Sequence, residues 1–269
     1  MTASDRLKRP YPYLPRSFKS AYPFSLAATS FIYPDYMAPN ARMLGPYLDE
    51  MELLFFESRH PGSLPQPQEI HELKSLSQKY GLSYNIHLPL DISLTAKAAA
   101  ERRQAVETIK YCIDLAGCLS PTTWTIHLPY EDEGDDFNDW LDRTGESLSQ
   151  LFPAYIEGSM FSVETLSYPL EWIDGLLRAF DLSICLDICH MAVHGLDWKA
   201  FYELYAEKIP IIHLYGFRKA HEHLGLDQLS ADIRQSVAEI LDRFYGTLCL
   251  EVFSYPHLDA SLKILSQLA

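Results

Sequence analysis

Six short hydrophobic runs in this 269-residue chain each end in a side chain that can bind a metal ion. A buried strand that ends in a histidine or a carboxylate places a polar group at one edge of a sheet, where leaving it unpaired would be costly. Six such ends in one chain predict a shared ligand, and their residue types indicate a metal ion. The six terminal residues are His87, His127, Glu164, Asp187, His213 and Glu251.

The residue types indicate both the kind of ion and the number of ions. Imidazole and carboxylate ligands together suit divalent zinc, manganese, iron or cobalt, and zinc is our first expectation. One ion typically takes about four or five ligands, so His87 and His127 are surplus to a single site. A second ion bridged by Glu164 would use them. Two ions about 3.5–4 Å apart form a recurring clamp for displacement at phosphorus, which predicts hydrolysis of a phosphate ester.

A reaction at a single ion is the alternative. Glu164, Asp187, His213 and Glu251 could hold one ion for a sugar isomerase or epimerase, in which carboxylates move a proton beside a carbonyl group. That chemistry leaves the two remaining histidines without a task. The number of bound ions would therefore separate the two hypotheses.

Further candidate residues follow the sixth and seventh runs. His190 lies just beyond Asp187, and His221 and His223 lie in the segment after His213. We expect these three histidines to complete a third metal site or to bind the phosphate. The catalytic candidates are Glu164, His190 and Glu251. The candidates for substrate binding near the same edge are Tyr33, Glu57, Tyr215, Arg218 and Lys219.

The elements that must position these residues alternate between strand and helix, which is typical of a parallel sheet. The strands are expected at 24–33, 51–57, 82–88, 122–128, 160–166, 182–188, 209–215 and 247–253. The helices are expected at 39–50, 67–80, 95–116, 137–151, 169–180, 197–207, 230–245 and 258–268. Eight strands with all polar ends at their carboxyl termini predict a single-domain (β/α)8 TIM barrel over 24–269, because barrel active sites lie at that rim. The Pro- and Tyr-rich residues 1–23 are expected to form an extended arm packed on the barrel.

Composition narrows the function classes. The formal net charge of -14 disfavours nucleic acid as a partner, because such binding depends largely on Lys and Arg neutralising phosphates. No apolar stretch approaches the roughly 20 residues of a membrane helix, and the N-terminus lacks the features of a signal peptide. The odd count of five cysteines argues against a disulfide framework. We therefore expect a cytoplasmic protein with a small-molecule substrate and no membrane or nucleic-acid partner; nothing in the sequence specifies an oligomeric state.

The six strand-end residues resemble the metal ligands of the xylose isomerase-like barrels, which include the AP endonuclease family 2 enzyme endonuclease IV. The resemblance covers nearly the whole chain. It implies that Glu164 bridges two metals, that His87 and His127 hold one of them, and that Asp187, His213 and Glu251 hold the other. A third metal would fall on His190 and on an Asp-x-His motif, where this chain has His221-Glu222-His223 instead. An alternative register places Lys219 and His221 on that motif, so either two or three ions are expected.

A narrower resemblance connects the chain to the cobamide-remodelling phosphodiesterases. It rests on the segments 28–35, 39–40, 52–57 and 213–217, followed by His223-Leu224. This family is understood to hydrolyse a phosphoester in the nucleotide loop of cobamides. The resemblance therefore implies a metal-dependent phosphodiesterase that acts in corrinoid remodelling. A corrinoid-binding protein without catalysis is a further class, and DNA repair is an analogy that the negative charge opposes.

Overall fold

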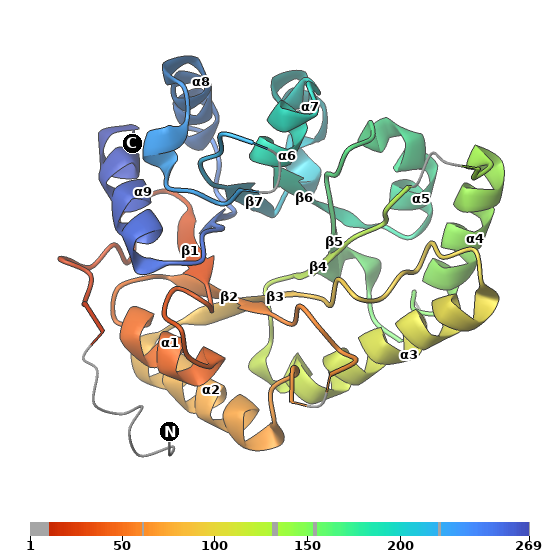
Figure 1. The fold of residues 1–269 in the computed structure, drawn as a ribbon, viewed down its shortest axis with the longest axis horizontal. Helices are drawn as coiled ribbons and strands as arrows, with labels where there is room; N and C mark the ends of the chain where they lie inside the picture. The colour runs from red at the N-terminus through yellow and green to blue at the C-terminus, as the bar shows by residue number, and fades with distance from the viewer. Residues whose placement is uncertain (1–10, 61, 131–133, 153–154, 220–221, 269) are drawn as a thin grey trace.

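The computed structural model describes residues 11–268 except 61, 131–133, 153–154 and 220–221. Eight parallel strands close into one barrel in which each strand pairs with the next in sequence and β8 pairs with β1. The predicted TIM barrel is therefore confirmed, with helices surrounding the strands (Figure 1). The strands are β1 (Ser25–Thr29), β2 (Glu50–Leu54), β3 (Ser83–His87), β4 (Trp124–Ile126), β5 (Phe161–Glu164), β6 (Ser183–Asp187), β7 (Ile211–Leu214) and β8 (Thr247–Leu250).

The helices cover the outside of the barrel. They are α1 (Met37–Leu44), α2 (Pro67–Tyr80), α3 (Ala99–Ala116), α4 (Phe137–Ser149), α5 (Asp174–Ala179), α6 (Ile188–Val193), α7 (Trp198–Tyr205), α8 (Ala231–Leu241) and α9 (Tyr255–Leu268). None of the helices in this part of the chain combines the length and the apolar character needed to cross a bilayer.

Several predicted boundaries were wrong. The predicted first strand at 24–33 ends at Thr29, and the predicted helix at 169–180 is a 3-10 turn, Leu170–Ile173, followed by the short helix α5. The predicted helix at 39–50 ends at Leu44, so that residues 45–49 can return the chain to the start of β2. The helix α6 was not predicted, because it is short and begins directly after Asp187 at the end of a strand.

Side chains on the strands alternate between the barrel interior and the surrounding helices. The outward positions are large and apolar and belong to the main hydrophobic core, as Leu26, Trp124 and Leu248 illustrate. The interior positions form a separate small cluster of Ala27, Cys185, Ile211 and Cys249. Three of these precede a predicted ligand by two residues. The period of two therefore places this cluster one layer below the carboxyl rim.

The interior below the rim also holds polar groups that satisfy one another. The buried Glu50 carboxylate accepts hydrogen bonds from the side chains of four residues on or beside other strands, at 2.7–3.2 Å. The donors are Ser83, Asn85, Thr122 and Thr247. Burial raises the pKa of Glu50, although these four hydrogen bonds oppose that effect. This end of the barrel is thus a closed structural core.

The described part of the predicted N-terminal arm contains no helix or strand before β1. Leu14 and Phe18 are buried in the main core. The Tyr33 hydroxyl donates a hydrogen bond to the Pro12 carbonyl at 2.6 Å. Residues 11–23 therefore pack on the barrel, while residues 1–10 of the predicted arm lie outside the described part of the chain.

Candidate metal centre at the carboxyl rim

A cavity of about 360 Å³ opens at the carboxyl ends of the strands. Its wall is a mixture of predicted metal ligands and apolar side chains. His213 lies beneath it and is fully buried. The convergence follows from the parallel order of the strands, which brings all of their carboxyl ends to one rim. The predicted ligands that line the cavity are His87, His127, Glu164, Asp187, His190, His223 and Glu251.

Glu164 lies at the centre of this arrangement. Its Oε2 atom is 3.1 Å from His87 Nε2, 2.9 Å from His127 Nε2 and 3.7 Å from His213 Nδ1. Burial raises the pKa of Glu164, but the neighbouring histidines outweigh it and hold the pKa well below its usual range. The carboxylate is therefore ionised at neutral pH and is shared by histidines from β3, β7 and the residue that follows β4.

The ligand atoms fall into groups that could each hold an ion. His87, His127 and Glu164 form one group, and Asp187, His213 and Glu251 form another; within each group the ligand atoms lie within 4.8 Å of one another. A further group joins Glu164 and Asp187 to His190. The six predicted strand-end residues are thus all brought together, with Glu164 in reach of both sides.

Several buried polar atoms here have no hydrogen bond within the described part of the chain. They include Asp187 Oδ2, Glu251 Oε2 and His213 Nδ1. Buried polar atoms without a hydrogen bond are rare, because each carries a desolvation cost. Burial, followed by the charges of Glu164 and Glu251, raises the pKa of Asp187 well above its usual range. A divalent cation would remove both the repulsion and the unpaired atoms, so the residues fit a metal.

The pKa of His87 yields a prediction for the metal-free protein. Burial lowers this pKa, but the hydrogen bond and the charge of Glu164 prevail and raise it to about 9. A histidine whose pKa is higher in the folded state stabilises the fold most at pH values below its pKa in the unfolded chain, about 6.5. This stabilisation is lost as the pH rises toward 9. We expect metal-free protein to lose roughly 3 kcal/mol of stability between these limits.

Thermal denaturation after dialysis against a chelator measures this loss. The melting temperature should fall from pH 6.5 to 9 in the metal-free wild type, and the fall should be smaller in His87→Gln. Saturating zinc should also reduce this fall in melting temperature, because metal binding displaces the proton from His87. A melting temperature that stays level across this range in the metal-free wild type would contradict the pairing of His87 with Glu164.

Sequence comparison identifies the family. The profile of the xylose isomerase-like TIM barrel matches residues 40–268, which is most of the chain. The chain belongs to the xylose isomerase-like TIM barrel family. No curated protein matches it at a significant level.

Solved structures agree with this xylose isomerase-like fold. A D-tagatose 3-epimerase-like protein superposes with a TM-score of 0.75 at 17% identity, over 91% of this chain and 97% of that one. Endonuclease IV from Thermus thermophilus gives 0.68 at 17% identity, over 90% and 99%. D-allulose 3-epimerase from Methylomonas sp. gives 0.65 at 12% identity, over 96% and 100%. At these identities the likeness shows the shared fold alone.

The three additional histidines differ in how they lie around the candidate metal centre. The backbone N–H of His190 donates to Asp187 Oδ1 at 2.7 Å, so Asp187 caps α6 and positions this histidine at the cavity. His223 Nδ1 lies 2.9 Å from the Glu251 carbonyl oxygen, and its ring stacks on Tyr215 with centroids 4.0 Å apart. His190 belongs to a described ligand group, whereas His223 lines the cavity without joining one. His221 lies outside the described residues.

The residues predicted to bind substrate do not line the cavity. Tyr33 is buried against the N-terminal segment, and Tyr215 is buried beneath His223. Glu57 is exposed and lies 3.9 Å from His60. Arg218 donates two hydrogen bonds to Gln228 Oε1, while the backbone N–H of Lys219 donates to Glu222. Their predicted role therefore stays a prediction, without a contact to the metal centre.

One buried carboxylate beside the metal centre was not predicted from the sequence. Glu52, on β2, is fully buried, and its Oε1 atom is 2.9 Å from His213 Nε2 without the alignment of a hydrogen bond. Cys249 Sγ donates to the other oxygen of Glu52 at 3.3 Å. The sequence pattern that could have predicted this residue is the pair Glu50 and Glu52 in an otherwise apolar strand. Residues two positions apart on a strand point to the same side, so both carboxylates point into the barrel interior.

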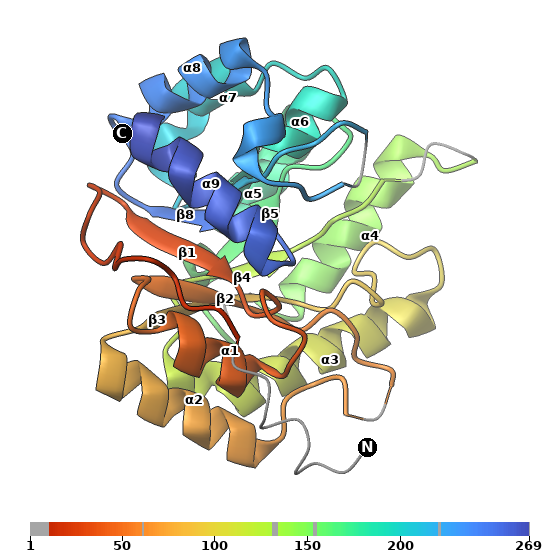
Figure 2. The ribbon, with the colours of Figure 1, turned by 60° about the vertical axis from the view of Figure 1, so that its left-hand side comes forward.

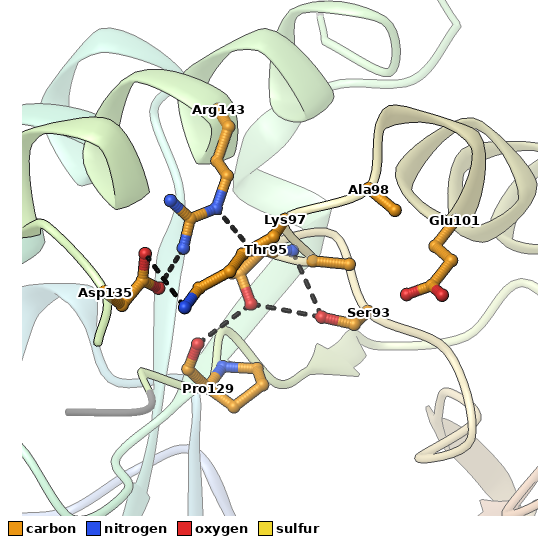
Figure 3. Close-up of a pocket in the computed structure, with 9 residues that line it drawn as sticks. Ser93, Thr95, Lys97, Ala98, Glu101, Pro129, Asp135 and Arg143 are labelled. Atoms are coloured by element: carbon orange, nitrogen blue, oxygen red, sulfur yellow. Dashed lines mark hydrogen bonds and ion pairs between the residues drawn. The ribbon is translucent and has the colours of Figure 1, made fainter. Parts of the chain in front are cut away.

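A second pocket lies between the loops before α3 and α4 and shares no lining residue with the metal centre. Arg143 is nearly buried there, and its Nε atom donates to the Thr95 carbonyl at 2.7 Å. Its guanidinium group also pairs with Asp135, which lies 4.0 Å from Lys97 Nζ (Figure 3). The positive charges of this pocket are thus already paired with a carboxylate or a carbonyl. We therefore place no phosphate site in it.

Proposed function

We propose that this protein is a metal-dependent phosphodiesterase that hydrolyses a phosphoester in the nucleotide loop of cobamides. The observation that carries its two-metal chemistry is the sharing of Glu164 by two sets of ligands. His87 and His127 provide a second set of ligands, in addition to the four residues that one ion would need. Those four are Glu164, Asp187, His213 and Glu251. When bound, two cations would neutralise the phosphodiester, polarise its phosphorus and supply a nucleophile derived from water.

The chain's own residues have distinct roles in this proposal. Glu164, kept ionised by its histidines, holds both halves of the centre together. Glu251 also has a lowered pKa: burial and the charge of Glu164 raise this pKa, but the charges of His213 and His223 outweigh them. Burial lowers the pKa of His190, so its imidazole is neutral at pH 7 and suits either a metal or a hydrogen bond to a phosphate oxygen. We propose Glu164, His190 and Glu251 as the catalytic residues.

The direct test is incubation of zinc-loaded protein with adenosylcobalamin, followed by mass spectrometry. Release of a cobinamide species together with the nucleotide fragment would support the proposal. Tight binding without any released fragment would instead indicate a corrinoid-binding protein. An abasic DNA duplex serves as the control substrate, and we expect little cleavage of it because of the net charge of -14.

The second candidate is a sugar isomerase or epimerase that uses a single ion. It is favoured by the ligand group of Asp187, His213 and Glu251, to which Glu164 Oε2, 3.7 Å from His213 Nδ1, would add a fourth ligand. The epimerases among the solved structures of the same fold favour it as well. It gives no role to His127, whose Nε2 lies 2.9 Å from Glu164 at the edge of the cavity.

His127→Ala distinguishes the two candidates. For a two-metal phosphodiesterase we expect this variant to lose one ion per chain and at least about 100-fold in kcat, because even partners outside the ligand shell are worth 10–100-fold. Metal content by mass spectrometry and turnover of adenosylcobalamin measure both. One ion per wild-type chain that His127→Ala retains, with no turnover of adenosylcobalamin by either protein, would favour the isomerase.

A further inference from the structure

An apolar groove lies beside the metal cavity at the same rim. It has a volume of about 560 Å³ and runs between the segment after β1 and the segment before α2. These two segments lead into α1 and α2, which pack side by side (Figure 2). Phe31, Tyr36 and Leu64 line the groove, and Tyr36 is 61% exposed. The exposed rings of Phe31 and Tyr36 and the half-buried Leu64, gathered in one hollow, indicate a binding site.

Aromatic rings connect this groove to the metal centre. The Phe31 ring stacks on Phe56 with centroids 5.9 Å apart and an angle of 8° between planes. Phe56 lines the metal cavity, and its ring meets His87 at 6.2 Å and Phe253 at 5.9 Å. Two ring contacts therefore lead from a predicted metal ligand to the groove. A single ligand can contact both, because Phe31 and Phe253 are each more than a third exposed.

The charged groups of the groove already have partners. Glu69 Oε1 accepts a hydrogen bond from the backbone N–H of Ala38 at 3.1 Å, and Glu72 is paired with Arg42. The other polar side chains in the lining, such as Gln66 and Gln68, are uncharged. The groove therefore suits an uncharged body that offers a flat apolar face and can exchange hydrogen bonds with amides at its edge.

We propose that this groove is a second subsite, which binds a large part of the same substrate with an apolar face and uncharged amides at its edge, while the phosphodiester lies at the metal centre. The inference rests on the proposed function. For a cobamide, the part in the groove is the corrin ring with its amide side chains. A sugar phosphate alone would leave these apolar surfaces exposed to water.

Binding of dicyanocobinamide tests the subsite without catalysis, because this probe carries the ring but lacks the nucleotide loop. We expect metal-free and zinc-loaded wild type to bind it, and Tyr36→Ala and Leu64→Ser each to weaken the Kd roughly five- to tenfold. Tyr245→Ala is the matched control. Tyr245 is 77% exposed and precedes β8, at the opposite end of the barrel, so its removal should leave the Kd unchanged.

Turnover separates the subsite from the metal chemistry. The two groove variants should raise the KM for adenosylcobalamin by a similar factor and leave cleavage of methyl p-nitrophenyl phosphate, a small diester, within about twofold. A Kd for dicyanocobinamide that neither variant changes would overturn the subsite, even if cobamides are cleaved. Conversion of a dimer to a monomer by Tyr36→Ala in sedimentation would also overturn it, by showing that a second copy covers the groove.

The proposed function can fail independently of the subsite. Wild type that binds dicyanocobinamide in a manner sensitive to Tyr36→Ala, but that releases no fragment from adenosylcobalamin, would support the subsite and contradict the phosphodiesterase.

Discussion

Replacing Glu164 with Gln is expected to abolish metal binding and turnover together. The substitution keeps the size of the side chain but removes the charge that faces His87, His127 and His213. An amide in that position offers one oxygen instead of a carboxylate shared between the ligand groups. We expect metal affinity to fall more than about 100-fold and kcat to fall at least about 1,000-fold, since the lost interaction would act on the ions and on the transition state.

Metal content of the dialysed protein and turnover of adenosylcobalamin measure this effect. The matched control is Glu157→Gln, the same substitution just before the opposite end of the same strand, where the side chain is exposed. The control should bind metal and turn over like the wild type. A Glu164→Gln protein that keeps both its metal and its activity would rule out a centre built on this residue.

The strand-end ligands could be predicted because two simple rules determine their position. Neighbouring strands of a parallel barrel run in the same direction, and a polar residue at the end of a buried run must therefore lie at the common rim. His127 and Glu251 follow this rule although each lies one residue beyond its strand. The prediction required no knowledge of which strands face each other across the barrel.

The residues that the sequence did not predict depend on contacts across the barrel or between loops. Glu52 lies opposite His213, and their strands, β2 and β7, are not neighbours in the sheet. The stacking of Phe31 on Phe56 joins two loops whose conformation no periodic pattern specifies. Tyr33, chosen for its position after the first strand, instead packs on the N-terminal segment. Local periodicity gives the face of a strand, whereas such contacts require the folded chain.

Glu52 provides the second large expected effect, because it lies behind a metal ligand. Its Oε1 atom lies 2.9 Å from His213 Nε2, and although the two atoms are not aligned for a hydrogen bond, the negative charge of the carboxylate favours the proton on that nitrogen. His213 Nδ1 is then left facing the metal side, at 3.4 Å from Glu251 Oε2 and 3.7 Å from Glu164 Oε2. A carboxylate behind a metal-binding histidine fixes both the tautomer and the orientation of the ring. We therefore infer that Glu52 positions His213 without contacting the metal or the substrate.

Glu52→Gln should weaken zinc affinity about 10–100-fold, because the amide can turn a donor toward His213 Nε2 and draw the proton to Nδ1. Competition with a chelator measures the affinity, and ¹⁵N NMR of the histidine rings measures the tautomer of His213. The matched control is Glu50→Gln, on the same strand one layer deeper. Its carboxylate accepts hydrogen bonds from Ser, Asn and Thr side chains, so this variant should lose stability but keep its zinc affinity. Equal losses of zinc affinity in the two variants would mean that Glu52 supports the barrel interior in general. An unchanged zinc affinity in Glu52→Gln would mean that His213 is oriented only by the groups around its Nδ1 atom.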